Sequence, residues 1–318
     1  MNAVWRQLGD WFTTPVPKGR IAAFRTVTYL FVIVDIVWIT TWVRMHADVP
    51  GELYVPLLIG RILPLPVPTE GLVHGVWWAL IVTGALAATG RFPRLLGWTV
   101  FALYFEWMII AMSYGKVDHD RIAFLMALAV LPTLGRARHG DRTPTESGGW
   151  ALRMVQIAVI ATYFLAAWAK LRYAGLDWLT GATLTRAVLR RGTWCSEWTV
   201  GVPGLLIFGQ FAIVAFELFS PVIFFVKRRW QYWLIGYFYV FHLVTFMALG
   251  IAFWPHLVAM LCFLPIERVQ PLVWIRDLFA RALGRPARGG GELASPASGV
   301  PESAAGPPGA GAPAPAEP

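Results

Sequence analysis

Long apolar runs separated by short polar segments constrain this chain more than any other feature of its sequence. One run, residues 149–171, is long enough to cross a bilayer, because a membrane-spanning helix needs about 20 apolar residues. It closes with Lys170, and an earlier run closes with the polar segment SYGKVDHDR (113–121). Lipid offers backbone polar groups no partner, so such runs fold as helices that satisfy their own hydrogen bonds. The sequence therefore predicts an all-α, polytopic transmembrane helical bundle.

The charge content supports this fold class and excludes some functions. Only 14% of the 318 residues are charged, whereas about 25% is usual for a soluble domain. The 17 Trp and nine Tyr residues agree with a membrane protein, since their rings collect at bilayer interfaces. The net charge of +9 comes from Arg clusters in short segments between apolar runs, a pattern typical of membrane topology rather than of a basic groove. We therefore expect no nucleic-acid partner.

The apolar runs predict about eight membrane passes. They lie at approximately 21–43, 72–90, 95–113, 121–135, 150–170, 203–226, 231–249 and 251–266. Every second connecting segment is basic, so the positive-inside rule predicts that the N-terminus and the C-terminus are both cytoplasmic. The outer segment 171–202 departs from this rule because it contains several Arg residues: Arg172, Arg186, Arg190 and Arg191.

The chain divides into four parts by composition. We expect residues 1–20 to form an amphipathic cytoplasmic segment that lies on the membrane. They lack the apolar core and small-residue cleavage site of a signal peptide. The transmembrane domain covers 21–268, and a basic cytoplasmic segment follows at 269–288. Residues 289–318 are rich in Gly, Ala and Pro and hold too few apolar side chains to bury a core, so we expect a disordered tail.

A short amphipathic helix is expected in the outer segment, at GATLTRAVLRRG (181–192). Its apolar face would carry Leu184, Ala187, Val188 and Leu189, and its Arg residues would meet lipid headgroups. An interfacial helix that anchors the segment and a lid that covers a site are both compatible with this pattern.

Several ionisable side chains lie inside the apolar runs, where they are costly and mark either structural pairs or functional sites. For Asp35 we favour a structural pair with an Arg or a hydroxyl, and Glu106 is similar. Arg25 lies near the cytoplasmic end of its run, where snorkelling explains it. Glu217 lies four residues before Pro221, a spacing that predicts a helix kink.

Three further polar residues converge on the non-cytoplasmic side if there are eight passes. They are Lys170, His119 and His242, and His256 lies across the last outer segment from His242. These residues also have interpretations that involve no site. A Lys at the end of a membrane helix often snorkels, and polar residues such as those of 113–121 make short connections soluble.

The two cysteines show no metal-ligand spacing, so we expect no metal site. Eight passes place Cys195 and Cys262 toward opposite faces of the membrane, so we expect no disulfide between them.

The segment YFLAAWAKLRYAGLDWLTG (163–181) resembles one found in vitamin K-dependent gamma-glutamyl carboxylases. It is also similar to their bacterial relatives, the HTTM (horizontally transferred transmembrane) proteins. SYGKVDHDRIAFLMALAVLPTL is similar to the family's His-containing loop and the following helix. AAFRTVTYLF, FELFSPVIFF and YVFHLVTFMALGIAFWPHLVAMLCFL occur in the family's order. The resemblance covers about residues 15–268 and implies a multi-pass protein of a bacterial cell membrane.

The resemblance also implies a chemistry. Lys170 matches the family's base, which deprotonates vitamin K hydroquinone or another menaquinol-type quinol, and His119 matches the His of the preceding loop. Oxygen (O2) and carbon dioxide (CO2) are then co-substrates, and a Glu or another acidic carbon is carboxylated, as in a lyase. Ala169 stands where the family often has a second Lys, and the spacing from Lys170 to Trp178 looks longer. Quinol oxidation is therefore favoured over carboxylation of a docked protein.

These observations define the expected site. We expect Lys170 and His119 to be catalytic. A second set is expected to bind the quinol: His242, Tyr163, Trp168, Trp178, Trp254 and Asp120. The expected partners are membrane lipid, a quinone and a secreted peptide or protein substrate. The alternative is a non-enzymatic protein that binds a lipid or quinone, or that assists peptide maturation or export. A transporter is disfavoured, since the chain shows no internal repeat.

Overall fold

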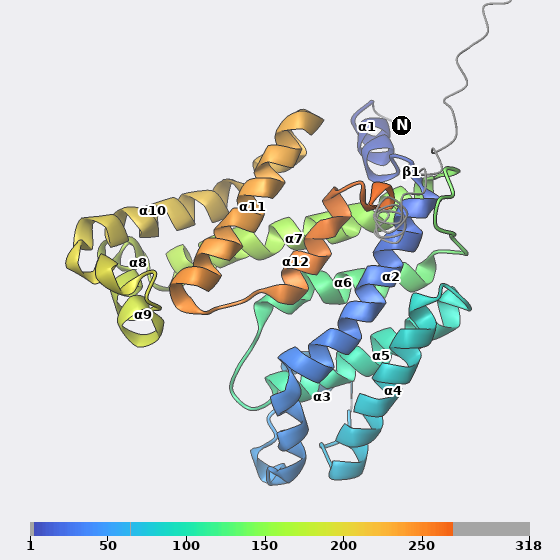
Figure 1. Cartoon of the computed structure of the whole chain (residues 1–318), viewed down its shortest axis with the longest axis horizontal. Coiled ribbons are helices and arrows are strands. Elements are labelled where there is room, and N and C mark those ends of the chain that lie inside the picture. Colours follow the sequence, from blue (N-terminus) through green and yellow to red (C-terminus); the bar gives the residue numbers. More distant parts are fainter. Residues whose placement is uncertain (1–2, 64, 270–318) are drawn as a thin grey trace, which may run out of the picture. The chain divides into compact units, whose positions relative to one another are not determined.

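The computed structural model describes residues 3–63 and 65–269, whose regular structure is almost entirely helical (Figure 1). Six helices in these residues are long and apolar enough to cross a membrane: Lys18–Ile39, Glu70–Ala88, Pro93–Met112, Glu146–Tyr173, Pro203–Phe224 and Arg228–Leu249. The expected all-α, multi-pass membrane fold is therefore confirmed. Apart from Val269, the predicted basic segment and C-terminal tail lie outside the described residues.

The α-helices and strands follow one another in this order: α1 (Ala3–Phe12), β1 (Val16–Pro17), α2 (Lys18–Val34), α3 (Leu58–Ile62), α4 (Glu70–Ala88), α5 (Pro93–Met112), α6 (Ile122–Val130), β2 (Pro144–Thr145), α7 (Glu146–Tyr173), α8 (Asp177–Thr180), α9 (Thr183–Arg191), α10 (Pro203–Phe219), α11 (Arg228–Leu249) and α12 (Trp254–Met260). A π-helical turn, Asp35–Ile39, extends α2. The remaining turns are 3-10 helices: Thr41–Asp48, Gly51–Leu53, His119–Arg121, Leu131–Thr133, Glu197–Gly201, Ser220–Phe224, Leu261–Phe263 and Ile266–Arg268.

Helix packing builds one main core and a smaller one. α2 packs on α4 and α4 on α5, while α6 packs on α7 and α7 on α10 (Figure 1). α12 contacts both α6 and α7 and so closes the middle of the bundle. The main core buries large side chains such as Trp107, Tyr29 and Phe238. The smaller core joins α7, α8 and α10 through Ala167, Leu179 and Val214, next to the site described below.

Two predicted passes are occupied by short helices. The window 121–135 holds the nine-residue α6 followed by a 3-10 turn, because Pro132 in that turn cannot continue an α-helix. The window 251–266 holds the seven-residue α12 and a second 3-10 turn. Both are shorter than the roughly 20 residues of a regular pass. Each is nevertheless packed inside the bundle rather than at its edge.

A two-stranded antiparallel ladder joins the segments that precede α2 and α7. Val16 pairs with Thr145 and Pro17 with Pro144, and the amide of Lys18 donates to the carbonyl of Thr143 at 2.9 Å. α2 and α7 therefore start side by side, although more than a hundred residues separate them in the chain.

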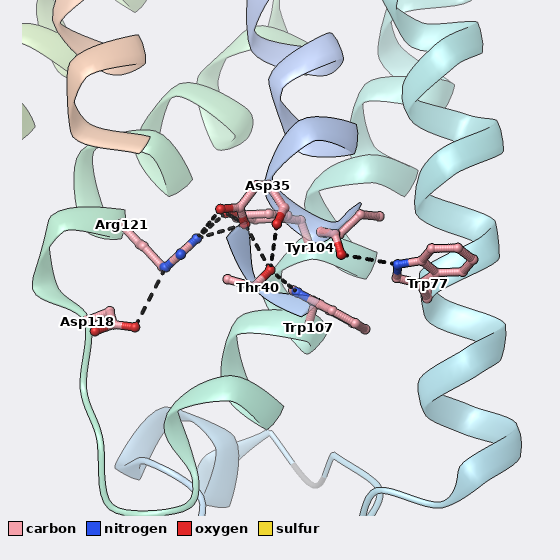
Figure 2. Close-up of polar contacts among 8 residues, drawn as sticks. Asp35, Thr40, Trp77, Tyr104, Trp107, Asp118 and Arg121 are labelled. Carbon is pink, nitrogen blue, oxygen red and sulfur yellow. Dashed lines mark hydrogen bonds and ion pairs between the residues drawn. The ribbon is translucent and has the colours of Figure 1, made fainter. Parts of the chain in front are cut away.

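Asp35 is fully buried and forms the polar centre of the first helices (Figure 2). The Arg121 Nη1 atom donates to both Asp35 carboxylate oxygens at 2.9 and 2.8 Å, and the Tyr104 hydroxyl donates to the same carboxylate at 2.9 Å. The structural pair predicted for Asp35 is therefore confirmed. Its partner comes from the polar segment 113–121, so part of that segment belongs to the core rather than to a solvated turn.

The π-helical turn after Asp35 is held by side chains from neighbouring helices. The indole nitrogen of Trp77 donates to the Ile36 carbonyl at 3.2 Å, and that of Trp107 donates to the Thr40 hydroxyl at 3.1 Å (Figure 2). The Thr40 hydroxyl in turn donates to the Asp35 carbonyl at 3.0 Å. Two of these bonds accept at backbone carbonyls of the turn, and the Asp35 carbonyl also accepts from the Thr40 amide at 2.7 Å.

Arg25 does not snorkel, so that prediction was wrong. Its side chain is fully buried, and Nη2 donates to the Gly135 carbonyl at 3.1 Å, with Leu131 O at 3.4 Å. Leu131 begins the 3-10 turn that follows α6, and Gly135 lies just after that turn. Arg25 therefore binds the backbone beyond a neighbouring helix from inside the bundle.

Candidate functional site

An ion pair between α7 and α10 lies at the centre of the candidate site. Lys170 Nζ donates to Glu217 Oε1 at 2.6 Å and also to Oε2, and the side chains are 22% and 9% exposed. The Trp178 ring centroid lies 5.2 Å from Nζ, within the range of a cation–π contact. Removing two charges from water requires such partners. The pair thus explains how both charges are tolerated within apolar helices.

The pair borders a cavity of about 530 Å³ between α7, α9, α10 and α11. This volume lies within the range of small-molecule pockets, and most of the wall is apolar, as in such pockets. Six expected site residues line it: Lys170, His119, Asp120, Tyr163, Trp178 and His242. Glu217 and His256 line it too, although neither was expected in the site. The structure therefore gathers most of the predicted residues around one space.

Trp168 and Trp254, which were expected to bind the quinol, lie outside this cavity. Trp168 is 55% exposed, because it follows the lining residue Ala166 by two positions and so points to the opposite side of α7. Trp254 is the first residue of α12 and is 44% exposed, with its ring 6.1 Å from that of Phe246.

His119 is placed at the cavity by its neighbour Arg121. Both residues belong to one 3-10 turn, and the buried Arg121–Asp35 pair ties that turn to the core. In the described residues no hydrogen bond joins His119 to Lys170, and the His119 ring lies 6.4 Å from that of Phe253. The hydrogen-bond partner of Lys170 is thus Glu217 and not His119. Sequence reasoning missed Glu217 as that partner because it lies 47 residues away on another helix.

Asp120 lies between His119 and Arg121 in the same 3-10 turn and lines the same cavity. Burial raises the pKa of the Asp120 carboxyl above its usual range, and the adjacent Arg121 guanidinium opposes that rise.

A cluster of aromatic and imidazole rings forms the other polar region of the cavity. The Tyr163 hydroxyl and His242 Nε2 share a hydrogen bond of 2.6 Å. The His256 ring lies 4.8 Å from the Tyr163 ring, nearly perpendicular to it, and 5.5 Å from the His242 ring. Tyr163 precedes Lys170 by two turns of α7, or about 10 Å along the helix axis. The cavity therefore has two polar regions separated by apolar wall.

α9 covers the cavity and is held there by a buried glutamine. Leu184, Ala187 and Val188 line the cavity, whereas Leu189 is exposed. The buried Gln210 side chain accepts from the Leu184 amide at 2.7 Å. It also donates to the carbonyls of Trp178, Leu179 and Gly181. The lid interpretation of 181–192 is therefore favoured over an anchor whose whole apolar face meets lipid.

A second cavity, of about 700 Å³, lies along the adjacent face of α7 beside α6. It shares His119, Thr162, Ala166 and Lys170 with the first cavity. Its remaining wall is apolar and includes exposed residues such as Ile122. Lys170 thus borders both cavities.

Fold and site together define an all-α, multi-pass membrane protein whose largely apolar cavity holds a Lys–Glu ion pair. None of the family models, curated proteins or solved structures compared with the chain matches it. The resemblance to the carboxylases and HTTM proteins therefore stays a prediction.

Proposed function

We propose that this protein binds a lipid-soluble quinol, such as vitamin K hydroquinone, in the first cavity and removes a proton from it. The observation that carries the proposal is the Lys170–Glu217 pair at the wall of an apolar space. Apolar walls suit a ring compound, and the pair offers a donor and an acceptor to a hydroxyl group. The second cavity provides an apolar route toward the pair from between α6 and α7.

In this proposal, Lys170 and Glu217 have different roles in removing the proton. The family resemblance implies that Lys170 is the base, but an ammonium bonded to a carboxylate has no free lone pair. We therefore assign proton acceptance to the Glu217 carboxylate, which departs from the family's pattern. A hydroxyl hydrogen of the ligand passes to a Glu217 oxygen, and the Lys170 ammonium stabilises the negative charge that remains on the ligand oxygen.

The family resemblance extends this proposal. It adds O2 as the oxidant of the deprotonated ring and CO2 as the group added to a Glu or another acidic carbon of a secreted peptide or protein. The bacterial cell membrane is the proposed location, with the site toward the non-cytoplasmic side.

We also propose eight passes with both ends of the membrane domain on one side. The β1–β2 ladder supports this, because the starts of α2 and α7 lie together and an even number of crossings must separate them. α2, α4 and α5 supply three crossings, so the short α6 with its 3-10 turn has to supply the fourth. α7, α10 and α11 would then be the fifth, sixth and seventh crossings, and α12 the eighth.

The test uses the full chain in lipid nanodiscs with vitamin K hydroquinone. Trp fluorescence reports binding, ultraviolet absorbance reports loss of the hydroxyl proton, and an oxygen electrode reports oxidation. Lys170→Ala and Glu217→Gln are expected to slow proton removal about 100-fold, the size of a general-base contribution. The matched controls Lys227→Ala and Glu197→Gln change exposed residues outside the cavity and should act like the unchanged chain.

The outcomes separate the rival functions. Full activity of Lys170→Ala would refute the assignment of the site. Binding of the quinol without loss of its proton would support the non-enzymatic alternative, a lipid- or quinone-binding protein.

A further inference from the structure

Buried imidazole nitrogens border the first cavity next to Tyr163, which lies two helical turns from Lys170. His256 is 1% exposed, and among the described residues neither of its ring nitrogens has a hydrogen-bond partner. His242 Nδ1 is also buried without a partner, while Nε2 of the same ring bonds Tyr163. Both histidines line the cavity.

Packing alone does not account for His256. A neutral imidazole always carries one N–H donor and one acceptor nitrogen. Burying either without a partner sacrifices its hydrogen bonds to water, and native proteins nearly always avoid this. An apolar ring would fill the same space without that loss. The arrangement is therefore explained by a polar group that enters the cavity and meets these nitrogens.

The Tyr163–His242 bond prepares one of these nitrogens for a ligand. When the Tyr163 hydroxyl donates to Nε2, the His242 proton lies on Nδ1, which becomes a donor toward the cavity. His256 adds another donor and an acceptor beside it, since the two rings lie 5.5 Å apart. Together they match an oxygen that both accepts and donates, such as a hydroxyl group.

We propose that His256, together with His242 Nδ1, hydrogen-bonds a second polar group of the cavity ligand. The cavity then selects ring compounds with a hydroxyl at each end over compounds with only one. This inference rests on the proposed function, because the other hydroxyl is the one that meets the Lys170–Glu217 pair. His256 is thereby a residue that determines ligand specificity, not a catalytic one.

Two probes test this selection in nanodiscs: vitamin K hydroquinone, and the naphthol that has the same side chain but a single hydroxyl. The unchanged chain is expected to bind the quinol about tenfold more tightly, the effect of one buried hydrogen bond. His256→Phe should remove that preference by weakening quinol binding alone. His256→Gln keeps a donor and an acceptor and should restore part of it. His74→Phe is the matched control, because His74 is exposed on α4.

The two proposals fail in different ways. If the unchanged chain binds both probes equally tightly, the role of His256 is refuted while quinol binding stands, and this measurement does not depend on any variant folding. If His256→Phe weakens both probes equally, the residue acts on the fold and not on selection. If the unchanged chain binds neither probe, the proposed function itself fails.

Discussion

Replacing Arg121 with Met is expected to lower the free energy of unfolding by about 3 kcal/mol. Arg121 Nη1 lies within 3.0 Å of both Asp35 carboxylate oxygens and of the Tyr104 hydroxyl oxygen, and the two charged side chains are 6% and 0% exposed. Removing one partner of a buried pair costs about 3–5 kcal/mol. We expect a cost at the lower end of this range, since polar groups in a membrane also find partners in the unfolded state. Met fills much of the volume, so little cavity cost is added.

The assay is reversible unfolding in mixed micelles, followed by Trp fluorescence. The control is Lys116→Met in the same loop, where Lys116 Nζ lies 3.0 Å from an Asp118 oxygen but the Lys side chain is 70% exposed. Such a surface pair contributes at most about 1 kcal/mol. The double variant Asp35→Asn/Arg121→Met should be more stable than Arg121→Met, because it leaves no unpaired buried charge.

Two results would refute this reasoning. One is an Arg121→Met variant as stable as the Lys116→Met control. The other is a double variant whose loss equals the sum of the two single losses, since the pair would then contribute no coupling.

The remaining predictions concern the lid and the membrane orientation. Gln210→Leu removes four hydrogen bonds to the segment before and at the start of α9, so amide exchange in α9 should speed up while that in α4 stays unchanged; equal protection would mean that other contacts hold the lid. A membrane-impermeant maleimide should label the partly buried Cys195 from the non-cytoplasmic face. The buried Cys262 should stay unmodified. Labelling of Cys195 from the opposite face would contradict the proposed orientation.

The fold class was predictable because the length of an apolar run and its low charge decide membrane insertion by themselves. Pairings across the bundle were not. A need for a partner at Asp35 follows from its cost in lipid, but nothing local identifies Arg121, 86 residues later. Lys170 and Glu217 were each singled out, and only the packing of α7 on α10 brings them together.

Errors arose where one local rule competed with another. Arg25 lies near a helix end, which favours snorkelling, but the Gly135 carbonyl of the segment after α6 provides a partner inside the bundle. Trp168 was included for its ring, although helical periodicity already separates it from Tyr163 and Lys170. His256 was noticed but not assigned to the site, since a lone His in an apolar run is usually a packing residue. Its missing hydrogen-bond partners become visible only in the structure.

The Asp35–Arg121 pair sets a condition on how the protein is made. The ribosome synthesises about 5–20 residues each second, so the 86 residues between the partners take about 4–17 s. In a chain that inserts in the order of its synthesis, the first helix holds Asp35 in or near the bilayer throughout that interval without its cation. The insertion machinery or delayed entry of the helix therefore has to keep Asp35 out of the lipid during this interval. The Asp35 charge that stabilises the finished bundle is thus unfavourable while the bundle assembles.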